Sequence, residues 1–411
     1  MNLTGKHLLI CEEALTDYSG HFFTWIKAIR TIHLAAGARV TVAANRNVTP
    51  EIQKEIGAIP TYSHNIWDDS YYHPNPVIRY AGVFLHNWRV YTQTAHLLKQ
   101  IGPVDLILLP ACRIHHLIAW RLLCARYLGK KFQRLLFFIL TSEAIYNPDF
   151  TAFHFKKSSL LLKATLRTFA GLTRHGGVVP AGDSHITCHE YETFSGLPFR
   201  VLPSPGAALI YAKLSAGAGS SGPRTHDAGP RFVMLGLSGY DKGTDLVQDA
   251  VMGYLEKNPV SPARFVIQWS KPVVTPDGTT IPIRDALRNA PQIQLIEGSL
   301  SDVEYRAEFA QADFLLLPYR RRIYFNRISG VAVEAACSGI PMIVTENTWL
   351  SWALEEFGAG VTVKNDSAAD LVRKITHCFE NWKALAQQAK DRKAVALEKN
   401  STDRYLMCAW E

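Results

Sequence analysis

The sequence predicts an α/β protein built from two doubly wound, Rossmann-like parallel-sheet domains. Its 411 residues exceed what one hydrophobic core usually serves, so two domains of about 200 residues each are expected. In both halves, short apolar runs alternate with helical patterns, which is typical of parallel sheets covered by helices on both faces. A stretch rich in Gly, Ser, Ala and Pro lies between the halves, at residues 206–230.

The first domain is expected over residues 1–205 and the second over 231–380. Strands of the first are expected at 7–12, 39–44, 105–110, 134–140 and 177–180. Strands of the second are expected at 231–236, 264–269, 293–298, 313–318, 341–345 and 360–363. Helices of the second are expected near 243–256, 281–289, 301–311, 329–338, 348–357 and 366–380. Residues 381–411 read as a long polar-faced helix followed by a short apolar one.

The composition excludes several classes of protein. The chain is 47% hydrophobic and 19% charged, which is ordinary for a globular protein. The first apolar run is too short for a signal peptide, and no run approaches the roughly 18 apolar residues of a spanning helix. The seven cysteines are scattered and form no CxxC pair, which favours a reducing cytosol over a disulfide framework or a zinc site. We therefore expect a cytoplasmic protein.

The net charge of +8 is concentrated in residues 106–182, where eleven Lys or Arg residues face two acids. Within this window, residues 155–175 have the pattern of a basic amphipathic helix. Such a helix could lie on an anionic membrane surface or receive an anionic acceptor. Alternatively, it packs on the core and leaves a solvated basic face. Nucleic acid is a weaker option, because no RNP-like stretch or zinc-finger spacing accompanies the charge.

Candidate ligand sites lie where strands turn into helices, because open α/β sheets bind ligands beyond the carboxyl ends of their strands. After the first strand, Gly20 opens a helix and lets a ligand approach the backbone. In GLSGYDKGTDL, residues 236–246, two glycines and Lys242 suit a phosphate, although the P-loop spacing fails. A glycine turn with a surface lysine is the structural alternative there.

Two further turns complete this set. GSLSD, from Gly298, could read a flat nucleobase through backbone groups, but taken alone it is better explained as a turn with a Ser cap. YRRRIYFNRISG places four arginines before a helix that starts at Ser329 and Gly330, as in an anion site. Glu334, about one turn into that helix, could accept hydrogen bonds from sugar hydroxyls or pair with one of the arginines.

The order of these turns resembles the family 4 (group 1) glycosyltransferases, which have the glycosyltransferase B fold and retain anomeric configuration. The resemblance runs through LGLSGYDKGTDL, LIEGSLSDVEYRAEFAQADFLLLPY and ISGVAVEAACSGIPMIVT, then GAGVTV. It implies two domains facing a cleft, the first on the acceptor side and the second binding the nucleotide sugar. It also implies that the helices of 381–411 cross back to the first domain.

The resemblance implies specific donor-binding roles. Lys242 would bind the donor diphosphate, the helix start at Ser329 and Gly330 would add backbone N–H groups, and Glu334 would hold the ribose. The base would be framed by the residues from Ile296 to Ser299, Gly298 included. Gly20 would let a loop of the first domain close over the phosphates. No metal and no cofactor beyond the nucleotide-diphosphate sugar are expected, since basic residues and helix dipoles neutralise the leaving diphosphate.

Three family positions differ in this chain. The family pairs two glutamates with seven residues between them, and the first falls here on Asn326. The family arginine falls on Leu237, and the histidine after the strand 134–140 falls on Ser142. Arg320, Arg321, Arg322 or Arg327 could replace the arginine. A Tyr-x-x-Arg-x-Ser-Gly form of the helix start occurs among such transferases and matches Tyr324, Arg327, Ser329 and Gly330.

The resemblance predicts a retaining hexosyltransferase that acts in polysaccharide or glycolipid assembly. Its partners would be a nucleotide sugar and a glycan or lipid-linked acceptor, with peripheral membrane contact through 106–182 at the inner face of the membrane. The catalytic candidates are Tyr324, Asn326 and Glu334. The alternative is a catalytically silent glycan- or nucleotide-binding protein on the same scaffold. An epimerase would need an acid and base set that the sequence does not reveal.

Overall fold

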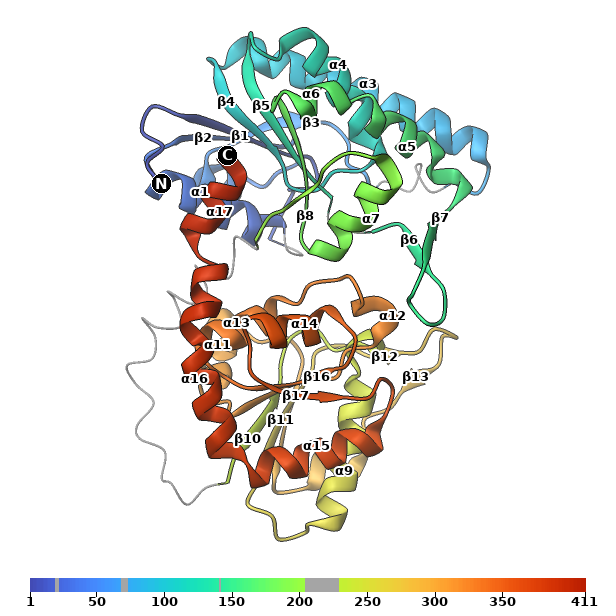
Figure 1. The fold of residues 1–411 in the computed structure, drawn as a ribbon, viewed down its shortest axis with the longest axis vertical. Coiled ribbons are helices and arrows are strands. Elements are labelled where there is room, and N and C mark those ends of the chain that lie inside the picture. The colour runs from blue at the N-terminus through green and yellow to red at the C-terminus, as the bar shows by residue number, and fades with distance from the viewer. Residues whose placement is uncertain (19–21, 68–72, 140–141, 204–228) are drawn as a thin grey trace. The chain divides into compact units, whose positions relative to one another are not determined.

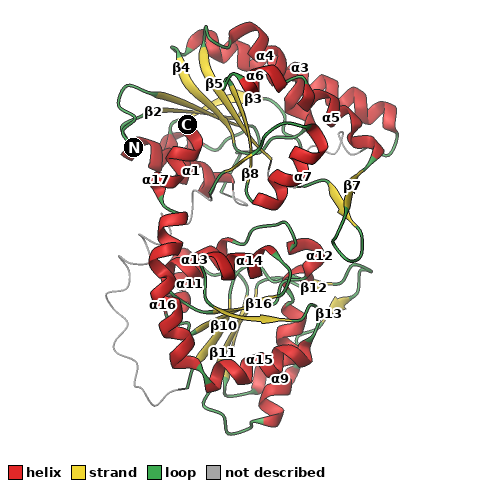
Figure 2. Ribbon diagram, viewed as in Figure 1, coloured by secondary structure: helices red, strands yellow, loops and turns green. Residues whose placement is uncertain are grey.

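Two parallel β-sheets organise the chain in the computed structural model (Figure 1). The structure describes residues 1–18, 22–67, 73–139, 142–203 and 229–411. The chain divides into a first unit, residues 1–206 with 402–411, and a second unit, residues 207–401. In each unit helices cover both faces of the sheet (Figure 2). The prediction of two parallel-sheet α/β domains is confirmed.

The first unit has seven strands in its main sheet, in the order β3-β2-β1-β4-β5-β8-β9. Its strands are β1 (His7–Glu12), β2 (Arg39–Asn45), β3 (Ala58–Tyr62), β4 (Val104–Leu109), β5 (Phe132–Ile139), β8 (Val178–Gly182) and β9 (Arg200–Val201), with the hairpin β6 (Ala144–Tyr146) and β7 (Phe153–Phe155). Its helices are α1 (Phe22–Ala35), α2 (Pro50–Ile56), α3 (Pro76–Gln100), α4 (Ile114–Tyr127), η2 (Lys157–Ser159), α5 (Leu160–Arg167), α6 (Ala170–Arg174), α7 (His185–Ser195) and α17 (Thr402–Trp410). β1 is buried at every position, so this strand forms the centre of the core.

The second unit has six strands in the order β14-β11-β10-β15-β16-β17. They are β10 (Arg231–Met234), β11 (Arg264–Trp269), β14 (Ile293–Glu297), β15 (Phe314–Leu317), β16 (Met342–Thr345) and β17 (Gly360–Val363), with the hairpin β12 (Val273–Val274) and β13 (Thr280–Ile281). The helices are η3 (Tyr240–Lys242), α9 (Thr244–Lys257), α10 (Asp285–Asn289), α11 (Asp302–Ala310), α12 (Arg321–Tyr324), α13 (Gly330–Ser338), α14 (Trp349–Glu356), α15 (Ala368–Glu380) and α16 (Trp382–Lys399). All neighbouring strands of the six-stranded sheet are parallel, so their carboxyl ends meet at one edge.

The last two helices belong to different units. α16 packs against α13 of the second unit, where the Cys337 thiol contacts the Ala396 carbonyl at 3.6 Å (Figure 1). α17 packs against α1 of the first unit, and Arg200 donates to the Cys408 carbonyl at 2.8 Å. The return to the first unit, expected over 381–411, thus begins at Thr402. Most of the expected linker, 206–230, lies outside the described residues.

The strands expected from the sequence are all present, and β3 and β9 of the main sheet were missed because each is short or contains a proline. The single amphipathic helix expected over 155–175 is wrong. This segment is the end of β7 followed by the short helices η2, α5 and α6. Leu162, Leu166 and Phe169 are at most 4% exposed and lie in the core. The core-packing alternative therefore holds, and the apolar face of this segment is not available to a membrane.

Candidate functional site

The strand order places the candidate site beside β10 and β15 of the second unit. From β10 the chain proceeds outward through β11 to β14, and from β15 it proceeds the other way through β16 to β17. Neighbouring connections therefore leave the sheet in opposite directions at the β10–β15 pair. In doubly wound sheets the carboxyl edge at such a reversal leaves room for a ligand. Lys242 follows β10 and α13 follows β15, so both flank this point.

Lys242 presents a half-buried ammonium group beside the start of α13. A methyl group built on Gly236 would lie 3.6 Å from Lys242 Nζ and 3.9 Å from Val331 Cγ2, the second residue of α13. Burial lowers the pKa of Lys242; Asp241 opposes the shift, and Lys271 and Arg327 add to it. Within the described residues we find no carboxylate within ion-pair distance of this ammonium. The arrangement places positive charge beside the start of a helix, where an anion would be stabilised.

The start of α13 is built as the sequence predicts. The Ser329 side chain accepts a hydrogen bond from Ala332 N at 3.3 Å and so caps the helix. Gly330 is exposed, and no atom lies within 4 Å of a Cβ built on it. The Tyr319 phenol, fully buried beneath this turn, hydrogen-bonds with the Ser329 side chain. The first turn of α13 is therefore rigid and open to solvent at Gly330.

Glu334 is buried in α13 and is paired with a tyrosine. Its Oε2 accepts a hydrogen bond from the Tyr305 hydroxyl of α11 at 2.8 Å. Burial raises the pKa of Glu334 to about 7, although the Tyr305 hydrogen bond lowers it. No arginine forms an ion pair with Glu334 within the described residues. The structural ion pair considered from the sequence is therefore not found there, and Oε1 remains available to a ligand.

The loop after β14 is held by the neighbouring strand β11. Ile296 pairs with Gln268 in the parallel register, and Gly298 turns with a positive φ of 104°. Gly298 N donates to the Trp269 carbonyl at 3.1 Å, and the Gly298 carbonyl accepts from the Gln268 amide at 3.0 Å. The backbone of Gly298 is thus committed to the protein. Ser299 is exposed and remains the candidate for contact with a base.

The arginines of 319–330 take different roles. Arg320 is 7% exposed, and its guanidinium binds Asp245 at 2.7 and 2.8 Å and Asp366 at 2.5 Å. It also lies 3.4 Å from the centre of the Tyr240 ring. Arg320 therefore holds η3 in place and does not serve as a substitute phosphate ligand. Arg327 is exposed and close enough to Lys242 to lower its pKa.

The other catalytic candidates lie at the end of α12 and on the turn that leads to α13. Tyr324 is 5% exposed, and its ring lies 4.5 Å from that of Tyr319. Burial raises the pKa of Tyr324 to about 12. Asn326 is half-buried two residues later. Gly20 lies outside the described residues, so its expected role stays a prediction.

Two family positions that differ in this chain have clear environments. Leu237 is 60% exposed in the loop after β10, so the apolar side chain there projects into solvent. Ser142 is half-buried and accepts a hydrogen bond from Ala144 N at 3.0 Å. Neither side chain supplies a charge to a ligand.

Sequence reasoning missed Tyr305, Gln268 and Lys271. Tyr305 lies 29 residues before its partner Glu334, and only the helix packing joins them. Gln268 is a polar residue within the apolar strand RFVIQW, which is a signal that could have singled it out. Lys271 follows the same strand end, and nothing in the sequence around it distinguishes it from other surface lysines.

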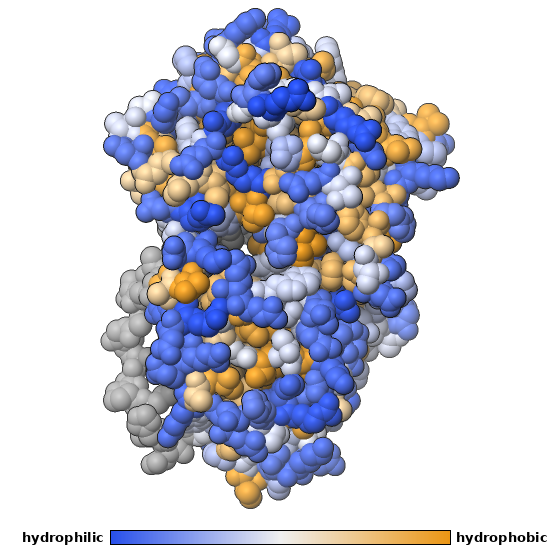
Figure 3. Space-filling view, viewed as in Figure 1, coloured by the Kyte–Doolittle hydropathy of each residue, from blue (hydrophilic) through white to orange (hydrophobic). Residues whose placement is uncertain are grey.

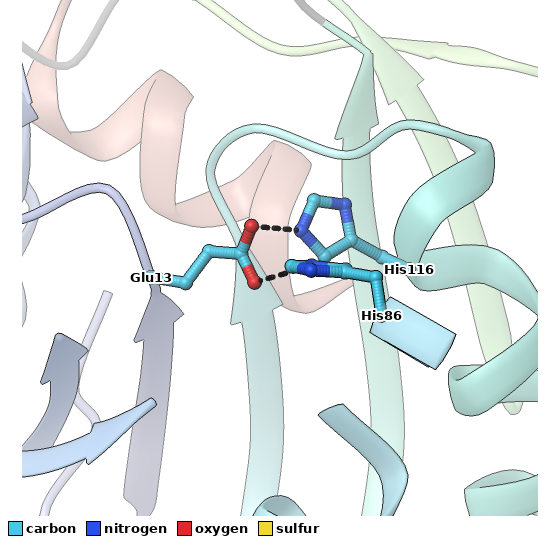
Figure 4. Close-up of side chains that lie close together, drawn as sticks. All are labelled: Glu13, His86 and His116. Carbon is cyan, nitrogen blue, oxygen red and sulfur yellow. Dashed lines mark hydrogen bonds and ion pairs between the residues drawn. The ribbon is translucent and has the colours of Figure 1, made fainter. Parts of the chain in front are cut away.

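A second cluster of chemically capable residues lies in the first unit, after β1 (Figure 4). Glu13 Oε2 lies 2.8 Å from His86 Nε2, and Glu13 Oε1 lies 3.1 Å from His116 Nε2. All three side chains are at most 8% exposed. Burial opposes ionisation, but His116 and His86 hold the pKa of Glu13 at about 2. The neighbouring Glu12 differs, because burial raises its pKa to about 8.

The ligand atoms of this cluster lie within 4.8 Å of one another, as in a metal site. The tautomer of His116 argues against that function. Arg113 N donates to His116 Nδ1 at 3.2 Å, so the ring proton sits on Nε2 and faces Glu13. A metal-bound histidine instead donates from its other nitrogen. We therefore interpret Glu13, His86 and His116 as a buried hydrogen-bonded network.

No protein-family model and no curated protein sequence matches the chain. Solved structures match it over nearly the whole length. A UDP-forming α,α-trehalose-phosphate synthase from Burkholderia xenovorans has a TM-score of 0.62 at 14% identity, covering 98% of both chains. HepE from Anabaena, in complex with UDP and glucose, has a TM-score of 0.57 at 13% identity, covering 98% of this chain and 97% of that one. The chain has the glycosyltransferase B fold.

The glycosyltransferase B fold is also represented among these matches by sucrose-phosphate synthase from Thermosynechococcus elongatus, with a TM-score of 0.58 at 13% identity, covering 98% of this chain and 100% of that one. A putative UDP-N-acetylglucosamine 2-epimerase from Listeria monocytogenes matches with a TM-score of 0.50 at 13% identity, covering 98% and 95%. One fold thus carries more than one activity. The choice of function must therefore come from the site.

Proposed function

We propose that the protein is a retaining glycosyltransferase that moves a sugar, of the hexose type, from a nucleotide-diphosphate sugar to a hydroxyl acceptor. The observation that carries this proposal is the half-buried ammonium of Lys242 beside the first turn of α13. Burying a cation without a carboxylate partner costs free energy, which a bound diphosphate would offset. UDP is the favoured nucleotide, since HepE was solved with UDP and the trehalose-phosphate synthase is UDP-forming.

Each part of the donor would have a place along the edge of the second sheet. Lys242, Arg327 and the backbone amides from Gly330 would bind the diphosphate, and the free oxygen of Glu334 would accept from the ribose hydroxyls. Ser299 and the loop after Ile296 would contact the base. This assignment keeps Lys242, the start of α13 and Glu334 in the roles that the sequence resemblance implies. It moves the base contact from Gly298, whose backbone groups are used, to Ser299.

The proposed transfer is a front-face reaction, in which the acceptor attacks from the face that the phosphate leaves and the anomeric configuration is retained. The bond between the sugar carbon and the phosphate oxygen breaks, the acceptor oxygen forms the new bond, and the acceptor proton passes to the departing phosphate. Lys242 and the α13 amides would stabilise the charge on that phosphate without a metal. Asn326 and the Tyr324 hydroxyl would orient the transferred sugar, since neither side chain is a proton acceptor at neutral pH.

A catalytically silent nucleotide- or glycan-binding protein is the second candidate. Asn326 and the exposed Leu237 favour it, because each stands where the resembling family has a charged residue. If the silent protein binds a nucleotide, it differs from the transferase only because it does not turn the nucleotide sugar over. A panel of UDP, GDP and ADP sugars therefore separates them. We expect one nucleotide to raise the melting temperature and its sugar to be released or transferred. Nucleotide binding without sugar release supports the silent protein. Absence of nucleotide binding contradicts the transferase and leaves only the glycan-binding form of the silent protein.

The acceptor is proposed to be a glycan or a lipid-linked sugar at the inner face of a membrane, in polysaccharide or glycolipid assembly. Of the described helices, none is long and apolar enough to span a bilayer, and hydrophilic residues cover much of the visible face (Figure 3). A peripheral contact would combine the exposed basic residues of 106–182 with the apolar side chains of α3. Phe84, Leu85 and Trp88 of α3 are 49–61% exposed.

Flotation with liposomes tests this contact. The wild type is expected to float with vesicles that contain anionic lipid and to remain behind with neutral ones. The double variant Phe84→Ser, Trp88→Ser should float less. Equal recovery with both kinds of vesicle would contradict the membrane proposal and leave the donor site unaffected.

A further inference from the structure

One buried amide side chain joins the two loops of the proposed donor site. β11 lies between β10 and β14 in the sheet, and Gln268 is its penultimate residue. Gln268 Oε1 accepts a hydrogen bond from Gly236 N at 2.8 Å, in the loop that leads to Lys242. Gln268 Nε2 donates to the Gly298 carbonyl at 3.0 Å, in the loop after β14. Because β11 neighbours both strands, a side chain at its end can reach both loops.

The chemistry of the two partners fixes the orientation of this amide. Gly236 offers an N–H and Gly298 offers a carbonyl, so the oxygen and the nitrogen of Gln268 cannot exchange places. Both glycines have positive φ, 101° and 104°, so both loops turn sharply at the atoms that Gln268 binds. Gln268 itself is 5% exposed, which excludes it from direct contact with most of a ligand.

Further contacts from the end of β11 reinforce the same two loops. Ser270 Oγ accepts from Ser238 N at 2.9 Å, and Lys271 N donates to Ser238 Oγ at 3.0 Å, two residues beyond Gly236. On the other side, the Trp269 carbonyl accepts from Gly298 N at 3.1 Å. Gln268 is the residue whose side chain contacts both loops in these hydrogen bonds.

We propose that Gln268 is a positioning residue that couples the diphosphate-binding loop to the base-binding loop, so that one nucleotide meets both in register. This inference rests on the proposed function, since it gives the two loops a common ligand. If the amide is lost, the Gly236 N–H and the Gly298 carbonyl lose their partners, and each loop can relax independently. Part of the binding free energy would then be spent on ordering the loops.

Gln248 supplies a matched control within the same unit. It is 1% exposed, its Nε2 donates to the Pro282 carbonyl at 3.2 Å, and its Oε1 accepts from Arg284 N at 2.9 Å. Gln248 thus also joins two backbone groups through a buried amide, but these groups lie before α10 and not in the proposed site. The substitutions Gln268→Met and Gln248→Met remove the same chemistry from the two places.

The test measures UDP affinity by calorimetry and amide hydrogen exchange of both variants, with the wild type beside them. We expect Gln268→Met to weaken UDP binding about tenfold and Gln248→Met to leave it within about twofold. Exchange at 236–242 and 298–301 should rise in Gln268→Met alone. Equal affinity losses in the two variants, or unchanged exchange in those loops, would overturn the coupling role.

A second variant keeps the proposal testable if Gln268→Met folds poorly. Gln268→Glu retains an oxygen for Gly236 N–H, and its acid can donate to the Gly298 carbonyl only while protonated. Its UDP affinity relative to the wild type should therefore rise from pH 8 to pH 6, and a ratio independent of pH would count against the role. Failure of the proposed function has a different signature: the wild type binds no nucleotide, while exchange still reports whether Gln268 couples the loops.

Discussion

The carboxyl ends of β1 and β10 occupy equivalent places in their two sheets. The charged residues that follow these two ends are neutralised in opposite ways. After β1, the Glu13 carboxylate is enclosed with His86 and His116, and all three are buried. After β10, the Lys242 ammonium is half-buried beside Arg327 and Lys271, which lower its pKa further. In the first arrangement the partners of the carboxylate, His86 and His116, belong to the protein itself. The second leaves an excess of positive charge that a ligand can neutralise.

The backbone also differs between the end of β10 and the end of β1. Gly243, beside Lys242, has a φ of 67°, and a Cβ built on it would lie 2.4 Å from the Pro318 carbonyl. Only glycine allows η3 to approach the end of β15 so closely. β1 ends at Glu12, and both Glu12 and the following Glu13 are buried. Gly243 thus fixes the place of Lys242 beside the end of β15.

Arg320→Met should have the largest effect on stability. It removes the guanidinium that binds Asp245 and Asp366 and leaves two carboxylates without their partner. Breaking a buried pair in this way typically costs about 3–5 kcal/mol of unfolding free energy. Chemical denaturation, followed by tryptophan fluorescence, measures it. Arg322→Met on the exposed side of α12 is the control and should change stability by less than about 0.5 kcal/mol. Similar losses in both variants would refute the structural role of Arg320.

Glu13→Gln should have the next largest effect on stability. It also tests whether the Glu13 network after β1 is separate from nucleotide binding. The folded pKa of Glu13 is about 2 against its usual 4.5, so the folded state favours the ionised carboxylate. This contribution is present above about pH 5, is lost as the pH falls towards 2, and amounts to about 3 kcal/mol at pH 7. The variant should lose that stability at pH 7 and show a flatter acid limb in denaturation between pH 5 and 2. Its UDP affinity should match that of the wild type, and a large loss of affinity would break the comparison.

Lys242→Met tests the proposed diphosphate site after β10. The variant keeps an apolar chain of similar length and removes the charge, so UDP binding should weaken by about 1.5–3 kcal/mol, the scale of a charge-assisted hydrogen bond. Without ligand it should be as stable as the wild type or more so, because a half-buried cation has been removed. Lys257→Met, at the exposed far end of α9, is the control for calorimetry and melting. Unchanged UDP affinity in Lys242→Met would contradict the assigned role.

The fold, and the sheet edge where Lys242 and the start of α13 lie, could be predicted from the sequence because their signals are local. Apolar runs of four to seven residues mark the strands, Gly236 and Gly298 mark the turns after β10 and β14, and Ser329 marks a helix start by its capping chemistry. Lys242 and Glu334 then fall at the same edge through topology alone. The order of elements thus predicts which residues come together without any side-chain detail.

The pairings could not be predicted, because they join residues far apart in sequence. Arg320 was indistinguishable from its neighbours until Asp245, 75 residues earlier, was seen to bind it. Glu13 and His86 are 73 residues apart, and nothing in the sequence near either residue indicates the other. The break in 155–175 was missed because its amphipathic pattern continues past the end of α5: Leu162 and Leu166 of α5 are buried, and so is Phe169, which lies between α5 and α6.

Glu334 should give the smallest effect, visible as a change of UDP affinity with pH. Its pKa is raised by burial from 4.5 to about 7, so at pH 6 most of the carboxyl is protonated and at pH 8 most is ionised. The ionised form accepts hydrogen bonds from the ribose hydroxyls more strongly than the neutral acid does. UDP affinity should therefore rise about tenfold from pH 6 to pH 8. Calorimetry at several pH values measures this rise.

Glu334→Gln corrects for the titration of UDP itself, because its phosphate also loses a proton near pH 6. The ratio of the wild-type affinity to that of the Glu334→Gln variant should follow the titration of Glu334 alone. Without ligand, a rise in pH has the opposite effect, on stability. Glu334 releases its proton above a pKa of 4.5 in the unfolded state but keeps it up to about pH 7 in the folded state. The free energy of unfolding of the wild type therefore falls as the pH rises from about 5 to about 7. Tyr305→Phe removes the hydrogen bond that lowers this pKa and should shift the rise in affinity to higher pH. A ratio that stays constant with pH would mean that Glu334 does not contact the nucleotide. The proposed donor site would then consist of Lys242 and the start of α13.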